Sequence, residues 1–161
     1  MLVPTALISF FAASGDAFAQ TYSFAPGEAK AVTGGAIAQA GDHELHLSGI
    51  EAPELDQICK DEAGKRYPCG LRSRDALAAL LARGATCTVE PRDRFKRNVV
   101  TCYAGTTDIN AEMVRRGQAL AHRDFDGRRY SADEARAKRS KLGLHAGSFM
   151  EPDRWRSGER W

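Results

Sequence analysis

Residues 45–54 read Leu-His-Leu-Ser-Gly-Ile-Glu-Ala-Pro-Glu, a short alternating segment followed by a glycine and a proline. Leu45 and Leu47 alternate with polar residues, which is the two-residue period of a strand with one buried face. Gly49 permits a tight bend, while Pro53 restricts the residue before it and lacks a backbone donor. The pattern therefore predicts a strand that ends abruptly here.

Two carboxylates follow the predicted strand. Glu51 and Glu54 stand three residues apart on an irregular segment at the strand's end. Proteins commonly present functional groups on such loops, because a rigid scaffold positions them. The pair is therefore the first candidate for a functional site.

Four motifs resemble the thermonuclease, or staphylococcal nuclease-like, domain. The stretch quoted above is similar to the family's strand-to-loop motif, and residues 93–97 are similar to its Asp-x-Tyr-Gly-Arg turn. Residues 108–117 resemble its Asp-Val-Asn helix, and residues 130–144 resemble its closing helix. The resemblance covers residues 27–148 and implies an α+β fold. The family's fold is a five-stranded OB-type β-barrel (the oligonucleotide/oligosaccharide-binding type) with about three α-helices.

Local patterns agree with such a fold. Two short strands meeting at a glycine turn are predicted within residues 29–40, and a hairpin is predicted from strands over 86–90 and 98–103. Helices are predicted over residues 71–82, 111–116 and 131–141. Ser131 and Glu134 form the pattern of a capping box at the start of the last helix.

Composition is typical of one soluble globular domain, with 161 residues, 43% hydrophobic and 27% charged, and a net charge of +2. Residues 1–19 hold an apolar run and end in Ala-Phe-Ala before Gln20, which fits signal-peptide cleavage. A disordered or apolar N-terminal tail is the alternative. We expect a thermonuclease-like domain over residues 20–148 and a surface or disordered tail over 149–161. The protein is predicted to be exported, periplasmic or secreted, monomeric, and without a stable membrane span after processing.

Four cysteines agree with export, because disulfides persist in oxidising compartments. They allow three connectivities, among which the sequence alone does not choose. Local geometry favours Cys59 with Cys69, closing the polar loop after the central motif, and Cys87 with Cys102, bridging the predicted hairpin. A zinc site is the alternative, although no cysteine pair has the two-to-four-residue spacing of a zinc knuckle.

The resemblance also implies a site for metal-dependent hydrolysis of nucleic-acid phosphodiesters, with Ca²⁺ as the family's cofactor. Glu54 matches the glutamate that orients or deprotonates water, and Arg97 matches the later phosphate-binding arginine. His46 stands in place of the family's other arginine, and a neutral imidazole lacks that arginine's charged fork. Glu51 stands at one metal-binding aspartate. Gly35 stands at the other, where the carboxylate is absent.

These departures predict weakened catalysis. Removing one positioned stabilising group costs about 2.7 to 4 kcal/mol, or roughly 10² to 10³ in rate. Asp42 and Glu44 are alternative sources of a displaced carboxylate. Two other functions stay open: a non-catalytic module of the same fold that binds nucleic acid or another polyanion, and a barrel that supports protein contacts only.

A basic turn is the predicted contact surface for nucleic acid. Arg94 and Lys96 flank Arg97 and are placed to contact backbone phosphates, with Phe95 available for base stacking. Tyr130 belongs to the same predicted set. A solvated turn with Phe95 packed on the barrel rim is the alternative. The expected partner is DNA or RNA, in single-stranded or unpaired regions.

Overall fold

A computed structural model gives the fold and describes residues 20–32, 37–40, 43–91, 96–122 and 127–161. The predicted signal peptide, residues 1–19, lies outside the described residues. None of the helices in the described ranges has the length and apolar character that a membrane crossing requires.

The main sheet has seven strands. Their spatial order is β1 (Thr21–Phe24), β8 (Ala85–Val89), β9 (Val99–Ala104), β4 (His43–Leu47), β3 (Ile37–Ala40) and β2 (Lys30–Ala31), and β10 (Thr107–Asp108) pairs with β9. Neighbouring strands are antiparallel except β4 and β9, which run parallel with His46 beside Val99. The predicted central strand, the predicted hairpin (β8 and β9) and the early strand pair (β2 and β3) are thus confirmed.

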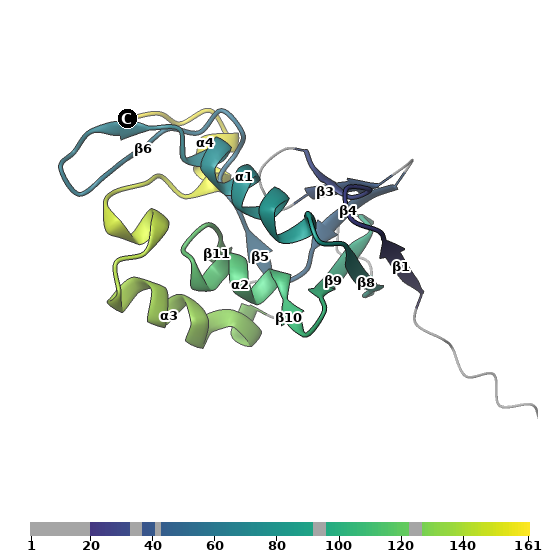
Figure 1. Ribbon diagram of the computed structural model, residues 1–161. Helices are drawn as coiled ribbons and strands as arrows, with labels where there is room; N and C mark the ends of the chain where they lie inside the picture. The colour runs from purple at the N-terminus through teal and green to yellow at the C-terminus, as the bar shows by residue number, and fades with distance from the viewer. Residues whose placement is uncertain (1–19, 33–36, 41–42, 92–95, 123–126) are drawn as a thin grey trace, which may run out of the picture.

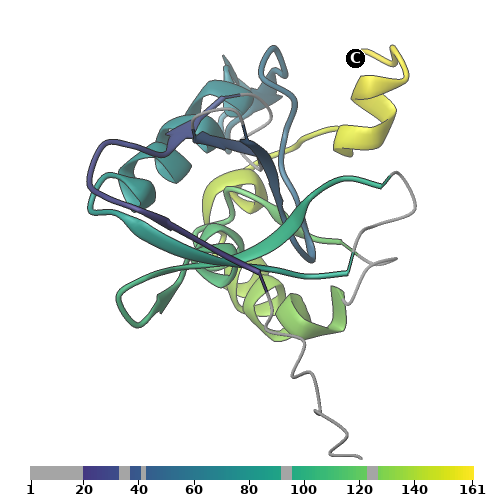
Figure 2. The same cartoon turned by 90° about the vertical axis from the view of Figure 1, so that its right-hand side faces the viewer.

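The remaining elements surround one end of this sheet (Figures 1 and 2). The helices are α1 (Cys69–Leu81), α2 (Ile109–Arg115), α3 (Ser131–Arg139) and α4 (Pro152–Arg156), with 3-10 turns η1 (Gly127–Tyr130) and η2 (Gly143–Ala146). Two small ladders pair β5 (Ile50–Glu51) with β11 (Leu120–Ala121), and β6 (Cys59–Lys60) with β7 (Arg66–Tyr67). In Figure 1 the main sheet lies on the right, α1 crosses the upper part, and α2 and α3 lie below it.

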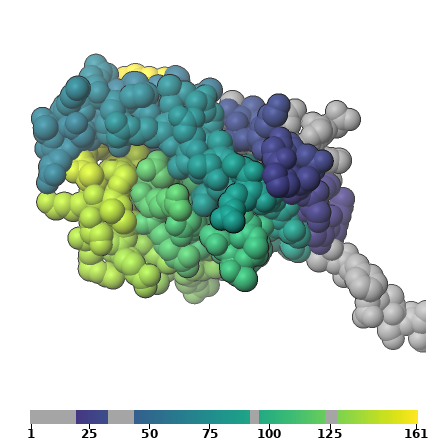
Figure 3. All heavy atoms as spheres, viewed as in Figure 1, coloured from purple at the N-terminus to yellow at the C-terminus, as the bar shows by residue number. Residues whose placement is uncertain are grey.

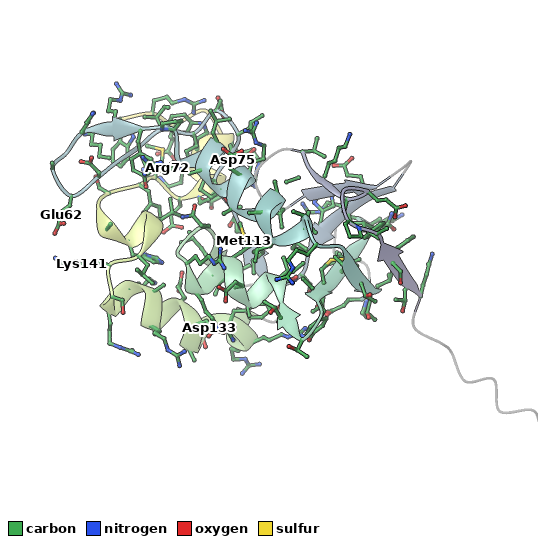
Figure 4. All side chains as sticks on the ribbon, in the orientation of Figure 1. Glu62, Arg72, Asp75, Met113, Asp133 and Lys141 are labelled. Carbon is green, nitrogen blue, oxygen red and sulfur yellow. A yellow bond between two sulfur atoms is a disulfide. The ribbon has the colours of Figure 1, made fainter. Side chains whose placement is uncertain are left out.

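One hydrophobic core joins the sheet to the helices. Leu45 and Leu47 of β4 are buried against leucines of α1, including Leu77 and Leu81. Met113 of α2, labelled in Figure 4, is fully buried in the same cluster. The alternating leucines of the central strand therefore have the role that their period predicts, because one face of β4 lies in the core.

A buried amide fixes the point where the chain leaves β4. The Asn110 side chain donates to the carbonyl oxygens of Ser48 (3.0 Å) and Val100 (3.1 Å), and its Oδ1 accepts from the backbone N–H of Cys102 (3.2 Å). Such bonds satisfy polar groups that would be costly to bury unpaired. Through them, α2 holds β9 and the exit from β4 in one register, and that exit leads directly to Glu51.

Both predicted disulfides are present. Cys87 and Cys102 lie opposite each other in the ladder of β8 and β9, with their Cα atoms 4.0 Å apart. Cys59 of β6 is bonded to Cys69 at the start of α1, with a Cα separation of 5.6 Å. The second bond closes the loop that follows Glu54.

The predicted five-stranded barrel with about three helices needs correction. The described residues form four α-helices and a seven-stranded sheet, and no ladder among them joins β1 to β2 to close a barrel. An OB-type arrangement stays consistent with this sheet. The difference in helix count arises at α4, because that segment has no apolar period in the sequence.

The predicted capping box is wrong. The Ser131 hydroxyl donates to the Arg128 carbonyl oxygen (2.9 Å), and the Glu134 carboxylate pairs with Lys138 (3.0 Å). The preceding turn η1 supplies a carbonyl three residues back, so Ser131 bonds to it rather than capping the helix. Tyr130 occupies the N-cap position.

The C-terminal segment is folded, which corrects the expectation of a surface or disordered tail. Pro152 is fully buried and the Trp155 side chain is 5% exposed. The Trp155 indole Nε1 donates to Asp56 Oδ1 at 3.0 Å, so α4 docks on the segment that follows Glu54. In Figure 3 yellow C-terminal atoms are visible behind the teal surface at the upper edge of the molecule.

Candidate active site

The two carboxylates of the central motif are held by backbone bonds on both sides. Glu51 belongs to β5 and is paired with Leu120 of β11. The backbone N–H of Glu54 donates to Gln57 Oε1 (3.1 Å), and its carbonyl oxygen accepts from the Gln57 N–H (2.8 Å). A Cβ at Gly70 would lie 1.8 Å from the Glu54 carbonyl oxygen, so α1 approaches this turn as only glycine allows.

Arg156 of α4 bridges the two carboxylates. Its Nε donates to Glu54 Oε1 at 2.7 Å, and its Nη2 lies 2.6 Å from the same oxygen. The Nη2 also lies 3.2 Å from Glu51 Oε1. Burial alone lowers the pKa of Arg156, but the hydrogen bonds and charges of Glu54 and Glu51 outweigh it and raise that pKa above its ordinary value. The site therefore holds a permanent cation between two acids.

His122 lies on the other side of Glu51. Its Nε2 is 4.0 Å from Glu51 Oε2, and its backbone N–H donates to the Gly49 carbonyl oxygen (2.9 Å). This imidazole follows β11, whose pairing with β5 places it there. His122 therefore adds an imidazole to the side of Glu51 that faces away from Arg156 Nη2, since the two groups lie near different oxygens of that carboxylate.

The predicted phosphate-binding residues are also brought together. Arg97 Nη1 lies 3.5 Å from His46 Nδ1, and His46 Nε2 lies 3.6 Å from Glu44 Oε1. His46 stands on β4 beside the first residue of β9, and Arg97 lies just before β9, so the parallel ladder explains their meeting. Lys96 is exposed next to them.

Other predicted residues fare differently. Arg94, Phe95, Gly35 and Asp42 lie outside the described residues. Tyr130 is 2% exposed, belongs to the core, and has its hydroxyl 3.5 Å from Asp108 Oδ2. Burial, followed by the Asp108 charge, raises the pKa of Tyr130. The structure thus places Tyr130 in the core beside Asp108, and its predicted role in nucleic-acid binding stays a prediction.

The described residues do not fit a calcium ion. Calcium takes six to eight oxygen ligands, but Glu51 and Glu54 already share Arg156, and no cluster of three or more His, Cys, Asp or Glu suited to a metal occurs within the described ranges. Glu44, one alternative ligand, is instead near His46.

Sequence patterns missed Arg156 and His122. Arg156 is 105 residues from Glu51 and 102 from Glu54, so only tertiary packing joins them. The one available signal is that Trp155 and Trp161 are the two tryptophans of the chain and both occur in its last seven residues. Large aromatic side chains in a short tail favour a docked segment.

The described residues form an α+β domain with a pair of carboxylates at the exit from its central strand. A family model described as "Staphylococcal nuclease homologue" matches residues 44–146, and the chain belongs to this family. It is 36% identical over 122 residues to the succinoglycan biosynthesis protein ExoI of Rhizobium meliloti, covering 73% of this chain and 63% of the relative.

Other relatives carry nuclease names. A probable staphylococcal-like nuclease of Oryza sativa subsp. japonica is 34% identical over 137 residues, covering 83% of this chain and 26% of the relative. A micrococcal nuclease of Shigella flexneri is 31% identical over 131 residues, covering 72% of this chain and 69% of the relative. The chain thus spans under two thirds of the length of the first two relatives.

Proposed function

We propose that this protein hydrolyses phosphodiester bonds of single-stranded or unpaired DNA or RNA, at a rate below that of family members with a complete site. The observation that carries the proposal is the Glu54 carboxylate, fixed in position and hydrogen-bonded to Arg156 Nε at 2.7 Å. An acid held next to a guanidinium offers a base for water and a cation for phosphate.

In this reaction the water oxygen bonds to phosphorus while its proton passes to Glu54. The bond from phosphorus to one sugar oxygen breaks, and that oxygen takes up a proton from solvent as it leaves, while Glu54 later returns its proton to solvent. Negative charge accumulates on the phosphate oxygens in the transition state, where guanidinium groups stabilise it. We propose Arg97, 3.5 Å from His46, and Arg156, 2.7 Å from Glu54, for this role.

The proposed weakness follows from His46. An arginine presents a planar fork of donors to phosphate, whereas the His46 ring lies 3.5 Å from Arg97 and 3.6 Å from Glu44. Replacing one such group costs about 2.7 to 4 kcal/mol of transition-state stabilisation. Hydrolysis by this protein should therefore be slower than hydrolysis by a family member that has an arginine at this position.

Export to the periplasm or the outside of the cell is part of the proposal. Two disulfides in a small domain favour an oxidising compartment. The first strand begins at Thr21, one residue after the first residue of the proposed mature chain. We propose a monomer in solution.

Cleavage by the oxidised protein tests the function. Fluorescent single-stranded DNA and RNA are incubated with parent protein and with Glu54→Gln, each with calcium and with chelator. Glu54→Gln should lose at least about 100-fold in rate. Glu62→Gln is the matched control, because Glu62 is an exposed carboxylate paired with Lys141 at 3.3 Å. Both residues are labelled in Figure 4.

Three outcomes are informative. Cleavage that disappears in Glu54→Gln but persists in Glu62→Gln supports the hydrolase. Strongly salt-dependent binding without cleavage would support the non-catalytic nucleic-acid or polyanion-binding module instead. Equal cleavage by parent and Glu54→Gln would show a contaminating nuclease and overturn the assignment of Glu54.

A further inference from the structure

The C-terminal segment places a cation, the Arg156 guanidinium, at the carboxylate site. In the family, the cation at this site is a metal ion. Arg156 contacts both Glu51 and Glu54, the two carboxylates of the central motif. We infer that Arg156 is a built-in replacement for the divalent ion: its guanidinium offsets one of the two carboxylate charges and binds the phosphate of the nucleic acid. This inference rests on the proposed function for the identity of the ligand.

Packing and hydrogen bonds of neighbouring residues fix the position of Arg156. Its neighbour Trp155 is buried and bonded to Asp56, and the Trp161 indole Nε1 donates to the Ile58 carbonyl oxygen at 3.3 Å. These anchors lie two to four residues after Glu54, on the same short segment. The helix that carries Arg156 is therefore fixed to the loop that carries its partner.

One buried side chain connects the two halves of the site. Gln57 is fully buried; its Oε1 accepts from the Glu54 N–H at 3.1 Å, and its Nε2 donates to the Met150 carbonyl oxygen at 2.7 Å. The same amide thus orients the turn of Glu54 and the entry to α4. Detaching α4 would break a buried hydrogen bond of this amide, so the arrangement favours a helix that stays in place.

The guanidinium has donors left for a ligand. Contacts with Glu51 and Glu54 use Nε and Nη2, and Nη1 has no partner among the described residues. The side chain is 57% exposed, so a phosphate in solution has access to it. An arginine that pairs with acids through one edge is able to bind a phosphate oxygen through another, because it carries five N–H donors.

Charge distinguishes this arrangement from a metal site. With Arg156 in place, two carboxylates and one guanidinium leave a charge of −1, which repels nucleic acid less than −2 and attracts calcium less. Removing the guanidinium should therefore weaken nucleic-acid binding and create affinity for calcium. A blocking role for α4 would have the opposite effect on nucleic acid.

The test compares Arg156→Gln with Arg154→Gln. Arg154 lies on the same helix, is 58% exposed and pairs with Glu159, so it is a matched control. Binding of fluorescent oligothymidine is measured by anisotropy in chelator, and binding of calcium chloride alone is measured by calorimetry. We expect Arg156→Gln to bind the oligonucleotide about tenfold more weakly and to bind calcium measurably more tightly than the parent.

A second variant keeps the charge. Arg156→Lys should bind calcium as weakly as the parent, because the cation remains, and should still bind the oligonucleotide less well, because the fork is lost. The inference is overturned if Arg156→Gln binds or cuts nucleic acid better than the parent, or if its calcium affinity is unchanged. The calcium measurement uses no nucleic acid, so it decides the role of the cation even if the parent neither binds nor cleaves DNA or RNA.

Discussion

At the scale of single residues, the local environment decides which side chains serve the site and which serve the core. Tyr130 and Arg156 show the difference. Tyr130 matches a family motif but is buried beside Asp108, whereas Arg156 matches none and bridges both acids of the site. Motif position reports descent, but burial decides whether a side chain is able to meet a ligand.

His145 gives a prediction at this scale. Burial lowers its pKa; the charge of Glu134 raises that pKa and the charge of Lys138 lowers it. Its Nε2 is buried with no hydrogen-bond partner in the described part of the chain. Because the folded state resists protonation more than the unfolded state, His145 should cost no stability above the unfolded pKa and reduce stability as the pH falls below it.

Urea unfolding of parent and His145→Gln between pH 5 and 8 checks this. The parent should lose free energy of unfolding more steeply toward pH 5, by at most about 1.4 kcal/mol per pH unit, and the variant should lack that part of the slope. Subtracting the two curves removes the contribution of carboxylates common to both. Parallel curves would contradict the assignment.

At the scale of elements, the C-terminal helix completes the site although it is only five residues long. A helix this short has little stability of its own, so its packing must hold it. Trp155, Pro152 and the bond from Gln57 to Met150 provide that packing. The order of α4 therefore depends on a few identifiable contacts.

Trp155→Ala should release this helix. Truncating a buried tryptophan typically costs about 3 to 5 kcal/mol, part of which appears here as local unfolding of the C-terminal segment. Tyr103→Ala is the control, because Tyr103 is an exposed aromatic residue of β9 and lies outside the C-terminal segment. Limited proteolysis followed by mass spectrometry should show cleavage near residues 150–161 in Trp155→Ala at protease levels that leave the parent and the control intact.

Sequence patterns predicted elements whose contacts are close in the chain. The central strand, the hairpin of β8 and β9, and both disulfides follow from periods and turns over about 20 residues or fewer. Arg156 and His122 were not predictable in this way, because their positions depend on packing between distant segments. The capping box of Ser131 failed because the turn before it offered a nearer carbonyl.

At the scale of the whole molecule, a hydrophobic core and two disulfides stabilise a fold that is built largely from short strands. The disulfides close loops with sequence separations of 10 and 15 residues. In the chain-entropy model each such bond contributes about 3 kcal/mol to the free energy of unfolding. A small domain of this kind should therefore depend on an oxidising environment.

Reduction of the disulfides should lower the free energy of unfolding by several kcal/mol, at about 3 kcal/mol per bond. Urea unfolding with and without a phosphine reductant measures the change. The Cys59→Ser/Cys69→Ser variant should lose about half of this free energy of unfolding without reductant. Adding reductant should then cost the variant only the other half, from the Cys87–Cys102 bond. Equal midpoints with and without reductant would contradict this structural role.

The position of Arg156 also affects where the C-terminal boundary of the functional domain lies. Residue 146 is the last one that the family model matches, and Arg156 lies ten positions beyond it. The family match thus ends before α4, the helix whose charge lies between the two carboxylates. A chain cut after residue 146 would keep every strand of its main sheet and both cystine bridges, yet Glu51 and Glu54 would lose their shared counter-charge and Gln57 its bond to Met150.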